Sequence, residues 1–401
     1  MDDVLSRLRR LAGDRPLPLA LLDLDAVDRN ARAIAARARR ANKTLRIATK
    51  SLRVVGLARH LLATAPDVCR GLLAFTAREA LSLHGEGFDD LLVAYPSVVP
   101  ADLAALADLA ERGATAAIVV DDPRHVQALS AAARGRGVTL HAVVDVDMSY
   151  RAAAGRVHLG VERSPVRDAA QAVALAARVA DAPGLSLDGF MGYEAQIAGL
   201  GDASPFAPAL NLPKRAIRAI SRPFVRRLRA EIVERARARG LAWRLFNGGG
   251  SGSLDSSCDD PSLTEVTAGS GFVDSHLFDH FSNISFEPAL FFALAVARAP
   301  RPGVVTCAGG GYVASGAAGP DRLPLPWAPR GLRLLPMEGA GEVQTPVAGD
   351  AARALAPGDP VFFRHAKAGE LAERFERYAV ARGDVVVDEW PTYRGQGWCL
   401  L

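Results

Sequence analysis

The sequence predicts an α/β protein in which a closed (β/α)8 barrel of the TIM type is followed by a separate β domain. Short apolar runs alternate with alanine-rich amphipathic stretches through the first two thirds of the 401 residues. Such alternation is typical of repeated βα units over a parallel sheet. About eight such units, over a length typical of these barrels, favour a closed barrel over an open sheet.

Nine apolar runs are predicted to be buried strands, because each is short and continuously apolar. In chain order they cover residues 19–25, 45–50, 71–76, 91–96, 116–122, 141–147, 187–193, 243–250 and 263–269. Helical spacing is kept between them, for example over DRNARAIAARARRA at 28–41 and over REALSLHGEG at 78–87, which ends in glycines.

The pattern changes near residue 285, so we place the barrel at residues 1–285 and the β domain at residues 286–401. Proline, glycine and alternating patterns such as GVVTCAGGGYVASG become frequent there, and long helices become scarce. Residues 368–383 are predicted to form a final helix. The first residues of the chain could pack on the β domain.

Composition excludes several classes of protein. Hydrophobic residues make up 49% and charged residues 23% of the chain, which is typical of globular proteins and argues against disorder. The 48 basic and 44 acidic residues are mixed along most predicted helices, so no nucleic-acid partner is expected. Because no apolar run is as long as a membrane span and the start, MDDVLSRLRR, is charged, we expect a cytoplasmic protein without a membrane partner.

Lysine is rare in this chain, which makes each lysine informative. The four are Lys43, Lys50, Lys214 and Lys367. Lys50 directly follows LRIAT, at the end of the predicted strand 45–50, and active sites of barrels lie at such strand ends. A lysine there can form a Schiff base with a carbonyl compound. A surface lysine in a loop is the alternative, and we favour the functional interpretation.

Two glycine- and serine-rich loops follow the last two predicted barrel strands. They are NGGGSGS at 247–253 and TAGSG at 267–271. Consecutive glycines let backbone N–H groups approach a phosphate, and the loops after strands seven and eight of a barrel often share one phosphate site. An ordinary turn is the alternative for either loop alone, but the pair favours phosphate binding.

A lysine and a phosphate site at one barrel mouth suit pyridoxal 5'-phosphate (PLP), which has an aldehyde and a phosphate. The ordered motifs TK (49–50), DVDMSYR (145–151), MGYEAQ (191–196), NGGGSGS and TEVTAGSG (264–271) resemble the fold-type III PLP-dependent enzymes, which have alanine racemase-like barrels. Within them the chain is most similar to the amino-acid deaminase/aldolase group, which includes D-threonine aldolases and D-serine dehydratases. The resemblance extends to GEVQTP and FRHAKAGE in the β domain.

The resemblance implies a role for each matching residue. Lys50 would hold PLP as a Schiff base, Arg151 would lie near its phenolic oxygen, and Tyr193 would lie near the pyridine edge. Phosphate donors would be Gly249, Gly250, Ser251, Gly269 and Ser270. For Asp145 and Asp147 we favour a structural role in orienting Arg151. The resemblance also implies a homodimer.

One motif departs from the family pattern. In the aldolase and dehydratase relatives a His-x-Asp or His-x-Cys pair in the β domain holds a divalent metal, whereas this chain has His365-Ala366-Lys367. An ammonium group does not ligate a cation, so a divalent metal is doubtful and no metal ligand is predicted. We hypothesise that Lys367 supplies the positive charge instead and that His365 is the acid/base.

The sequence therefore predicts a PLP-dependent lyase that acts on a small amino-acid substrate. As an aldolase, it would cleave or form the Cα–Cβ bond of a β-hydroxy D-amino acid, giving glycine or a related amino acid and an aldehyde. The nearest alternative is a PLP-dependent dehydratase that gives a 2-oxo acid and ammonia. Two further alternatives are a PLP-binding protein without catalysis and a barrel that binds phosphosugars through a Schiff base at Lys50.

Overall fold

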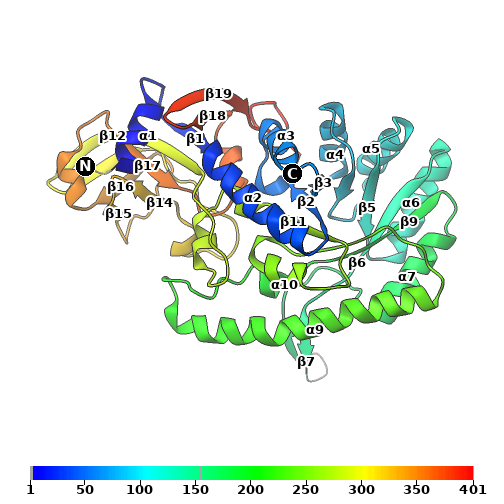
Figure 1. Cartoon of the computed structure of the whole chain (residues 1–401). Coiled ribbons are helices and arrows are strands. Elements are labelled where there is room, and N and C mark those ends of the chain that lie inside the picture. The colour runs from blue at the N-terminus through cyan, green and yellow to red at the C-terminus, as the bar shows by residue number, and fades with distance from the viewer. Residues whose placement is uncertain (1–2, 153–155, 401) are drawn as a thin grey trace.

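The computed structural model describes residues 3–152 and 156–400, and it confirms the predicted barrel and the β domain (Figure 1). Eight parallel strands pair in the order β10-β11-β2-β3-β4-β5-β6-β9 and close on themselves. They are β2 (Thr44–Ala48), β3 (Cys69–Ala74), β4 (Leu91–Val93), β5 (Ala116–Val120), β6 (Leu140–Asp145), β9 (Leu185–Gly192), β10 (Leu245–Gly248) and β11 (Glu265–Ala268). Each overlaps one of the predicted runs.

The first predicted run is a strand, but it lies outside the barrel. β1 (Leu19–Asp23) pairs antiparallel with β12 (Leu290–Arg301) and parallel with β18 (Arg377–Arg382), so it is a central strand of the second sheet. Helix α1 (Asp3–Ala12) packs on the same sheet. A short apolar run suits any buried strand position, and its periodicity does not say which sheet it joins.

Helices cover the outside of the barrel. They are α2 (Leu24–Arg40), α3 (Val55–Thr64), α4 (Ala77–Gly85), α5 (Pro100–Glu111), α6 (Pro123–Arg136), α7 (Ala169–Asp181), α8 (Ala195–Ala198), α9 (Asn211–Ala238) and α10 (Leu254–Cys258). Four begin at a side chain that accepts hydrogen bonds from the first turn, namely Asp23, Thr76, Asp122 and Asp168. Such caps satisfy backbone N–H groups that the helix itself leaves unpaired.

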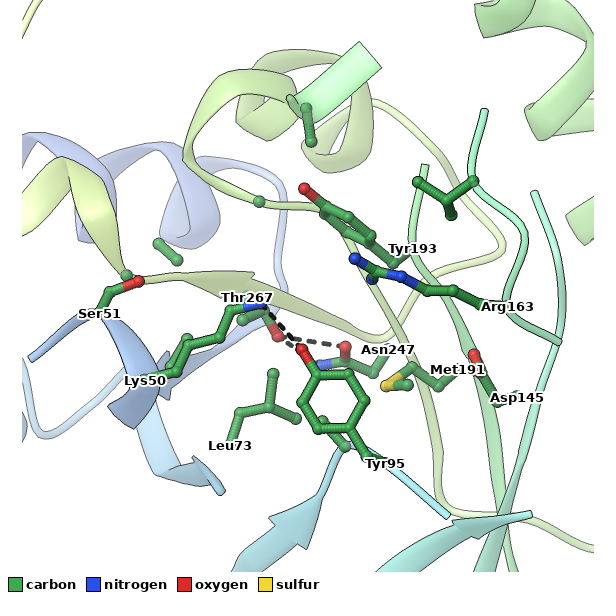
Figure 2. Close-up of a pocket in the computed structure, with 18 of the residues that line it drawn as sticks. Lys50, Ser51, Leu73, Tyr95, Asp145, Arg163, Met191, Tyr193, Asn247 and Thr267 are labelled. Atoms are coloured by element: carbon green, nitrogen blue, oxygen red, sulfur yellow. Dashed lines mark hydrogen bonds between the residues drawn. The ribbon is translucent and has the colours of Figure 1, made fainter. Parts of the chain in front are cut away.

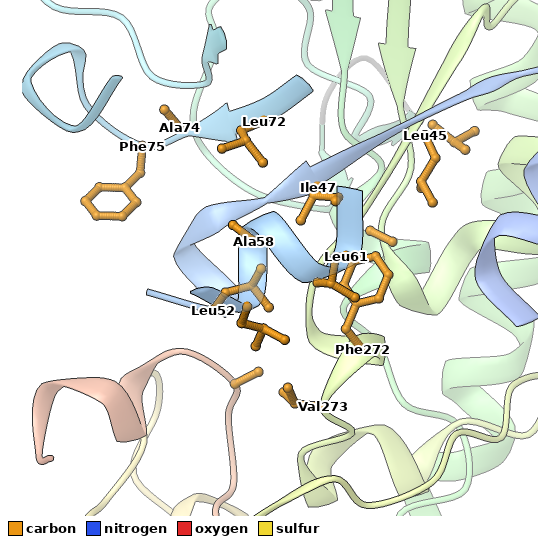
Figure 3. Packing of buried hydrophobic residues seen from close by; sticks show 14 of the residues in the cluster. Leu45, Ile47, Leu52, Ala58, Leu61, Leu72, Ala74, Phe75, Phe272 and Val273 are labelled. Carbon is orange, nitrogen blue, oxygen red and sulfur yellow. The ribbon is translucent and has the colours of Figure 1, made fainter. Parts of the chain in front are cut away.

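Apolar packing fixes the start of the barrel, where β2 and β3 lie against α3 (Figure 3). Ile47, Leu61 and Leu72 are fully buried there, together with Phe272 from the segment after β11. Burying a side chain of this size contributes about 1.5–3 kcal/mol. This core therefore holds the end of β2, from which the next residues enter the barrel mouth.

The second domain consists mainly of one twisted sheet. Besides β1, β12 and β18 it contains β13 (Val304–Ala308), β14 (Leu325–Ala328), β15 (Arg333–Leu334), β16 (Gln344–Ala348), β17 (Pro360–Arg364) and β19 (Val385–Pro391). The domain boundary between residues 285 and 286 stays a prediction. In the described part of the chain, no helix has the length and apolar character needed to cross a membrane.

The helix predicted over residues 368–383 is wrong. A short 3-10 turn (Glu370–Glu373) is followed there by strand β18, which pairs with both β1 and β19. Its residues favour a helix in isolation, but pairing on both edges satisfies the backbone and buries Tyr378 and Val380.

Candidate active site

A cavity of about 410 Å³ lies at the carboxyl ends of the barrel strands. This volume is within the range of small-molecule sites, and barrels carry their active sites at this end. Residues that follow β2, β4, β5, β9, β10 and β11 line it. Lys50 and the two glycine-rich loops, which the sequence placed at strand ends, are among these lining residues.

Lys50 lies in this cavity, on the 3-10 turn Thr49–Ser51 that follows β2. Its Nζ donates a hydrogen bond to the hydroxyl oxygen of Tyr95 at 3.1 Å (Figure 2). Burial alone would raise the pKa of Tyr95, but the adjacent Lys50 ammonium outweighs burial and lowers it. The lysine therefore has a phenol beside it that can exchange a proton with its nitrogen. Sequence reasoning missed Tyr95, although it lies at the end of a predicted strand.

The two glycine-rich loops meet beside Lys50. Ser251 Oγ accepts hydrogen bonds from Gly269 N (3.3 Å) and Gly271 N (2.9 Å). Ser51 and Ser270 are joined through their hydroxyl oxygens at 3.2 Å. All five predicted phosphate donors line the cavity. The structure thus brings both loops and the lysine turn together in one site.

Glycine is required where these loops face the cavity. A Cβ at Gly250 would lie 3.2 Å from the ring of Tyr193, and one at Gly269 would lie 2.7 Å from Ser51 Oγ. Gly249 has a φ of 86°, which side chains disfavour. At these positions the loop backbone therefore packs closely against neighbouring side chains, with no room for a side chain of its own.

A buried ion pair supports the first loop from behind. Glu194 Oε2 accepts from Gly249 N at 3.2 Å, and Oε1 accepts from the hydroxyl of Ser253 at 2.7 Å and of Ser257 at 2.5 Å. Arg229 of α9 pairs with the same carboxylate. Burial would raise the pKa of Glu194, but Arg229 and these hydroxyls hold it below the usual value. Glu194 follows Tyr193 in MGYEAQ, yet nothing in that motif indicated its partner.

Tyr193 lines the cavity, and burial raises its pKa to about 12, so its phenol is neutral. Arg163 lies over its ring, with 5.8 Å from the guanidinium carbon to the ring centroid, and Arg163 also lines the cavity (Figure 2). Sequence reasoning missed Arg163. It follows the hairpin of β7 (Tyr150–Ala152) and β8 (Val157–Leu159), which turns the chain back toward the barrel mouth.

Arg151 is placed differently from the prediction. Among the described residues, those that line the cavity do not include it. Its guanidinium pairs with Asp147 at 2.9 Å and with Glu162 at 3.5 Å. This pair agrees with the structural role favoured for Asp147, and the cofactor contact of Arg151 stays a prediction.

Carboxyl groups form part of the cavity wall on β5 and β6. Burial and the neighbouring Asp121 raise the pKa of Asp145 to about 7. Burial also raises the pKa of Asp121, against the favourable charge of His125. Asp145 is thus partly protonated near neutral pH and can donate a hydrogen bond within the cavity.

The two predicted catalytic residues of the β domain lie in a second cavity. His365 and Lys367 line a space of about 290 Å³ beyond the end of β17. Burial lowers the pKa of His365 to about 3, which leaves its imidazole neutral. The backbone of this loop packs closely against the backbone of Lys50. A Cβ at Gly369 would lie 1.9 Å from the Lys50 carbonyl oxygen.

A profile of the alanine racemase N-terminal domain matches residues 22–241, more than half of the chain. The chain belongs to this family. That region contains the lysine turn, Arg163 and strand β9, which ends just before Tyr193. Membership confirms the resemblance to fold-type III PLP enzymes that the motifs indicated.

Two proteins that are similar to this chain are named as aldolases. D-threonine aldolase of Arthrobacter sp is 28% identical over 291 residues, which cover 71% of this chain and 69% of that protein. 3-Hydroxy-D-aspartate aldolase of Paracoccus denitrificans (strain Pd 1222) is 27% identical over 259 residues, covering 64% of this chain and 60% of that protein.

Solved structures extend the similarity beyond the family region. D-threonine aldolase from Filomicrobium marinum superposes with a TM-score of 0.80 at 24% identity, over 96% of each chain. D-threo-3-hydroxyaspartate dehydratase from Delftia sp. HT23 gives 0.73 at 20% identity, over 94% of this chain and 98% of that one. The shared fold therefore includes the β domain as well as the barrel.

Proposed function

We propose that the protein is a PLP-dependent lyase of the aldolase type, which cleaves or forms the Cα–Cβ bond of a β-hydroxy D-amino acid. The carrying observation is that Lys50 and both glycine-serine loops line one cavity at the barrel mouth. Related aldolases of D-threonine and of 3-hydroxy-D-aspartate support a lyase and D-amino acids as the substrate class. A homodimer and a cytoplasmic location stay predictions.

The residues of the cavity fit PLP. Lys50 offers a primary amine, and the backbone of Gly249, Gly250 and Gly269 can approach a phosphate without obstruction by side chains. Ser251 and Ser270 add hydroxyl groups. When bound, PLP supplies an electron sink for the electron pair released at Cα.

The remaining groups orient the reactants and handle protons. Tyr193 presents a neutral phenol, and Arg163 presents a fixed positive charge on the same side of the cavity. Tyr95 can take a proton from the nitrogen of Lys50, or return it, across their 3.1 Å hydrogen bond. Arg163, which lines the cavity, would therefore contact the phenolic oxygen of PLP in place of Arg151.

His365 stays our candidate for the base that takes the proton of the substrate hydroxyl. A neutral imidazole has the free lone pair that this role requires. The lowered pKa of His365 makes its imidazole a weak base. Tyr95 is a second candidate, because a pKa lowered from that of an ordinary phenol makes its hydroxyl easier to deprotonate, and the phenolate can act as a base. A His365→Gln variant and a Tyr95→Phe variant, compared for their pH–rate profiles, would show which group titrates.

A dehydratase is the second candidate function, because a D-threo-3-hydroxyaspartate dehydratase shares the fold. Expulsion of a hydroxyl group benefits from a Lewis acid, whereas cleavage of the Cα–Cβ bond needs only a base at the hydroxyl. The Lys367 position offers no metal ligand, and this favours the aldolase.

The first test is optical. Purified protein, or protein given PLP, should absorb visible light, and borohydride should bleach the band. Lys50→Ala should abolish the band, whereas Lys214→Ala, a matched lysine outside the cavity lining, should keep it. A protein that binds no added PLP would refute the proposal.

The second test identifies the reaction. The holoenzyme is incubated with D-threonine and with D-serine, and aldehyde and 2-oxo acid are measured separately. We expect acetaldehyde and glycine from D-threonine. Formation of 2-oxobutyrate or pyruvate without aldehyde would replace the aldolase by the dehydratase, and a coloured protein without turnover would favour a PLP carrier.

A further inference from the structure

The cavity around His365 contains polar atoms that lack a partner. His365 is 2% exposed, and neither of its ring nitrogens makes a well-formed hydrogen bond to the residues that the structure describes. The backbone of Leu290 lies close enough to the imidazole to oppose the effect of burial on its pKa. Leaving buried polar atoms unpaired costs free energy, so such atoms indicate a ligand or a substrate group that completes them.

This cavity adjoins the barrel site through two backbone contacts. Leu277 N donates to Ala366 O at 3.3 Å, and the next residue, Phe278, lines the barrel cavity. Gly369, on the same loop as His365, lies against the carbonyl of Lys50. The loop from 365 to 370 therefore packs against the backbone of the lysine turn, and the cavity of His365 is a neighbour of the barrel cavity with its own lining residues.

The second feature of the cavity is a held ammonium group. Lys367 Nζ donates to Ser315 Oγ at 2.7 Å and pairs with Glu370 at 3.5 Å. Ser315 also donates to Glu370 through its backbone N at 2.8 Å and through its hydroxyl. Burial would raise the pKa of Glu370, but Ser315 and Lys367 lower it, so the carboxylate is ionised.

These donors do not fit a divalent metal. A metal ion needs lone pairs, and an ammonium group has none and repels a second cation. The nearby carboxylate of Glu370 is already paired with Ser315 and Lys367. The His-x-Asp or His-x-Cys pair implied by the resemblance is thus reduced to His365 alone, which is too few ligands for a stable site.

We propose that the Lys367 ammonium, held by Ser315 and Glu370, takes the place of a divalent cation beside the substrate, and that the enzyme works without a metal. The positive charge stabilises the oxygen from which the proton leaves, and His365 completes its hydrogen bonds with the substrate hydroxyl. The inference rests on the proposed lyase function for its catalytic part. The claim that the His365 cavity binds no divalent metal does not depend on the reaction and can be tested by metal binding alone.

The test converts the site into a metal site. Holoenzyme is treated with a chelator, dialysed and titrated with Mn²⁺ or Zn²⁺ by calorimetry. Wild-type protein should bind neither ion at the His365 cavity and should keep its activity in excess chelator. Lys367→Asp creates the His-x-Asp pair and should bind one ion at least about a hundredfold more tightly than wild type.

Two further variants separate the causes. Adding His365→Ala to Lys367→Asp should abolish the gained site, because one of its two ligands is lost. Lys367→Met keeps the length of the side chain but not its charge, so it should lower kcat at least about tenfold without gaining metal affinity. The visible absorbance of every variant reports whether the cofactor site is intact.

Several results would overturn the proposal. They are stoichiometric metal in wild type that disappears with His365→Ala, loss of wild-type activity in the chelator, and full activity of Lys367→Met. If Lys367→Asp does not fold, the wild-type titration and Lys367→Met decide. A protein that is colourless, or coloured without lyase turnover, refutes the proposed function instead, and the calorimetric results still test the metal site.

Discussion

At the residue scale, two arginines are candidates for the contact with the phenolic oxygen of PLP. Arg163 lines the barrel cavity next to Tyr193, whereas Arg151 is committed to Asp147 and Glu162. The family resemblance implied Arg151, which closes the motif DVDMSYR. The β7–β8 hairpin then carries Arg163 back to the mouth, and a contact produced by a hairpin leaves no local pattern in the sequence.

Substitution of each arginine by glutamine distinguishes them. Arg163→Gln removes a charged donor from the cavity, so we expect PLP to bind about 10 to 100 times more weakly, as measured by absorbance titration. Arg151→Gln breaks a pair outside the lining and should change the affinity far less. Equal losses in the two variants, or a greater loss for Arg151→Gln, would return the role to Arg151.

At the scale of elements, the glycine-rich loop depends on helix α9. Glu194 holds the loop through Gly249, and Arg229 of α9 neutralises Glu194 in a site where both are almost fully buried. The same guanidinium donates to Gly192 O at 2.7 Å, at the end of β9. Helix α9, which is rich in arginine, thus buries Arg229 against the loop that lines the cavity.

Removing one partner of this pair should be more costly than neutralising the other. Arg229→Met leaves the buried carboxylates of Glu194 and Asp260 without this counter-charge, and we expect it to lower the free energy of unfolding by about 3–5 kcal/mol. Glu194→Gln keeps an acceptor for Gly249 and should cost less. Urea unfolding of the two variants gives the comparison. A loss below about 1 kcal/mol for Arg229→Met would show that the pair does not stabilise the loop.

Some elements could be predicted from the sequence, and others could not. Barrel strands were predictable because burial on both sides makes each one a continuous apolar run, and the lysine turn and loops were predictable because they end such runs. The strand that each strand pairs with could not be predicted, because β1 pairs with β12 and β18, which lie more than two hundred residues away in the sequence. The same long-range pairing made a strand of residues that resemble a helix.

At the scale of the whole molecule, the C-terminal segment contacts the barrel close to the turn that carries Lys50. Tyr393 donates its hydroxyl to Glu79 Oε1 at 2.8 Å, and its backbone N donates to Arg53 O at 2.8 Å. Thr392 forms a β-bridge with Val54, in the same stretch after the lysine turn. The β domain therefore contacts the segment that places the lysine, so docking of the two parts and the geometry of the site are coupled.

Glu79 should make this docking depend on pH. Burial raises its pKa from 4.5 to about 7, despite hydrogen bonds from Phe75 N and Tyr393. A carboxyl whose folded pKa is raised stabilises the fold while protonated, and this contribution is lost as pH rises from about 4.5 through about 7. Glu79→Gln cannot ionise, so its free energy of unfolding relative to wild type should increase by about 2–4 kcal/mol between pH 5 and pH 8.

Tyr393→Phe tests the same contact from the other side. It removes a donor that the ionised carboxylate needs more than the protonated one, so it should destabilise the protein more at pH 8 than at pH 5. Comparison with wild type at each pH cancels the other groups that titrate near neutrality, including Asp145 and Asp274. Parallel unfolding curves at several pH values measure both effects. A pH-independent difference for both variants would mean that Glu79 has the same ionisation state in the folded and unfolded protein.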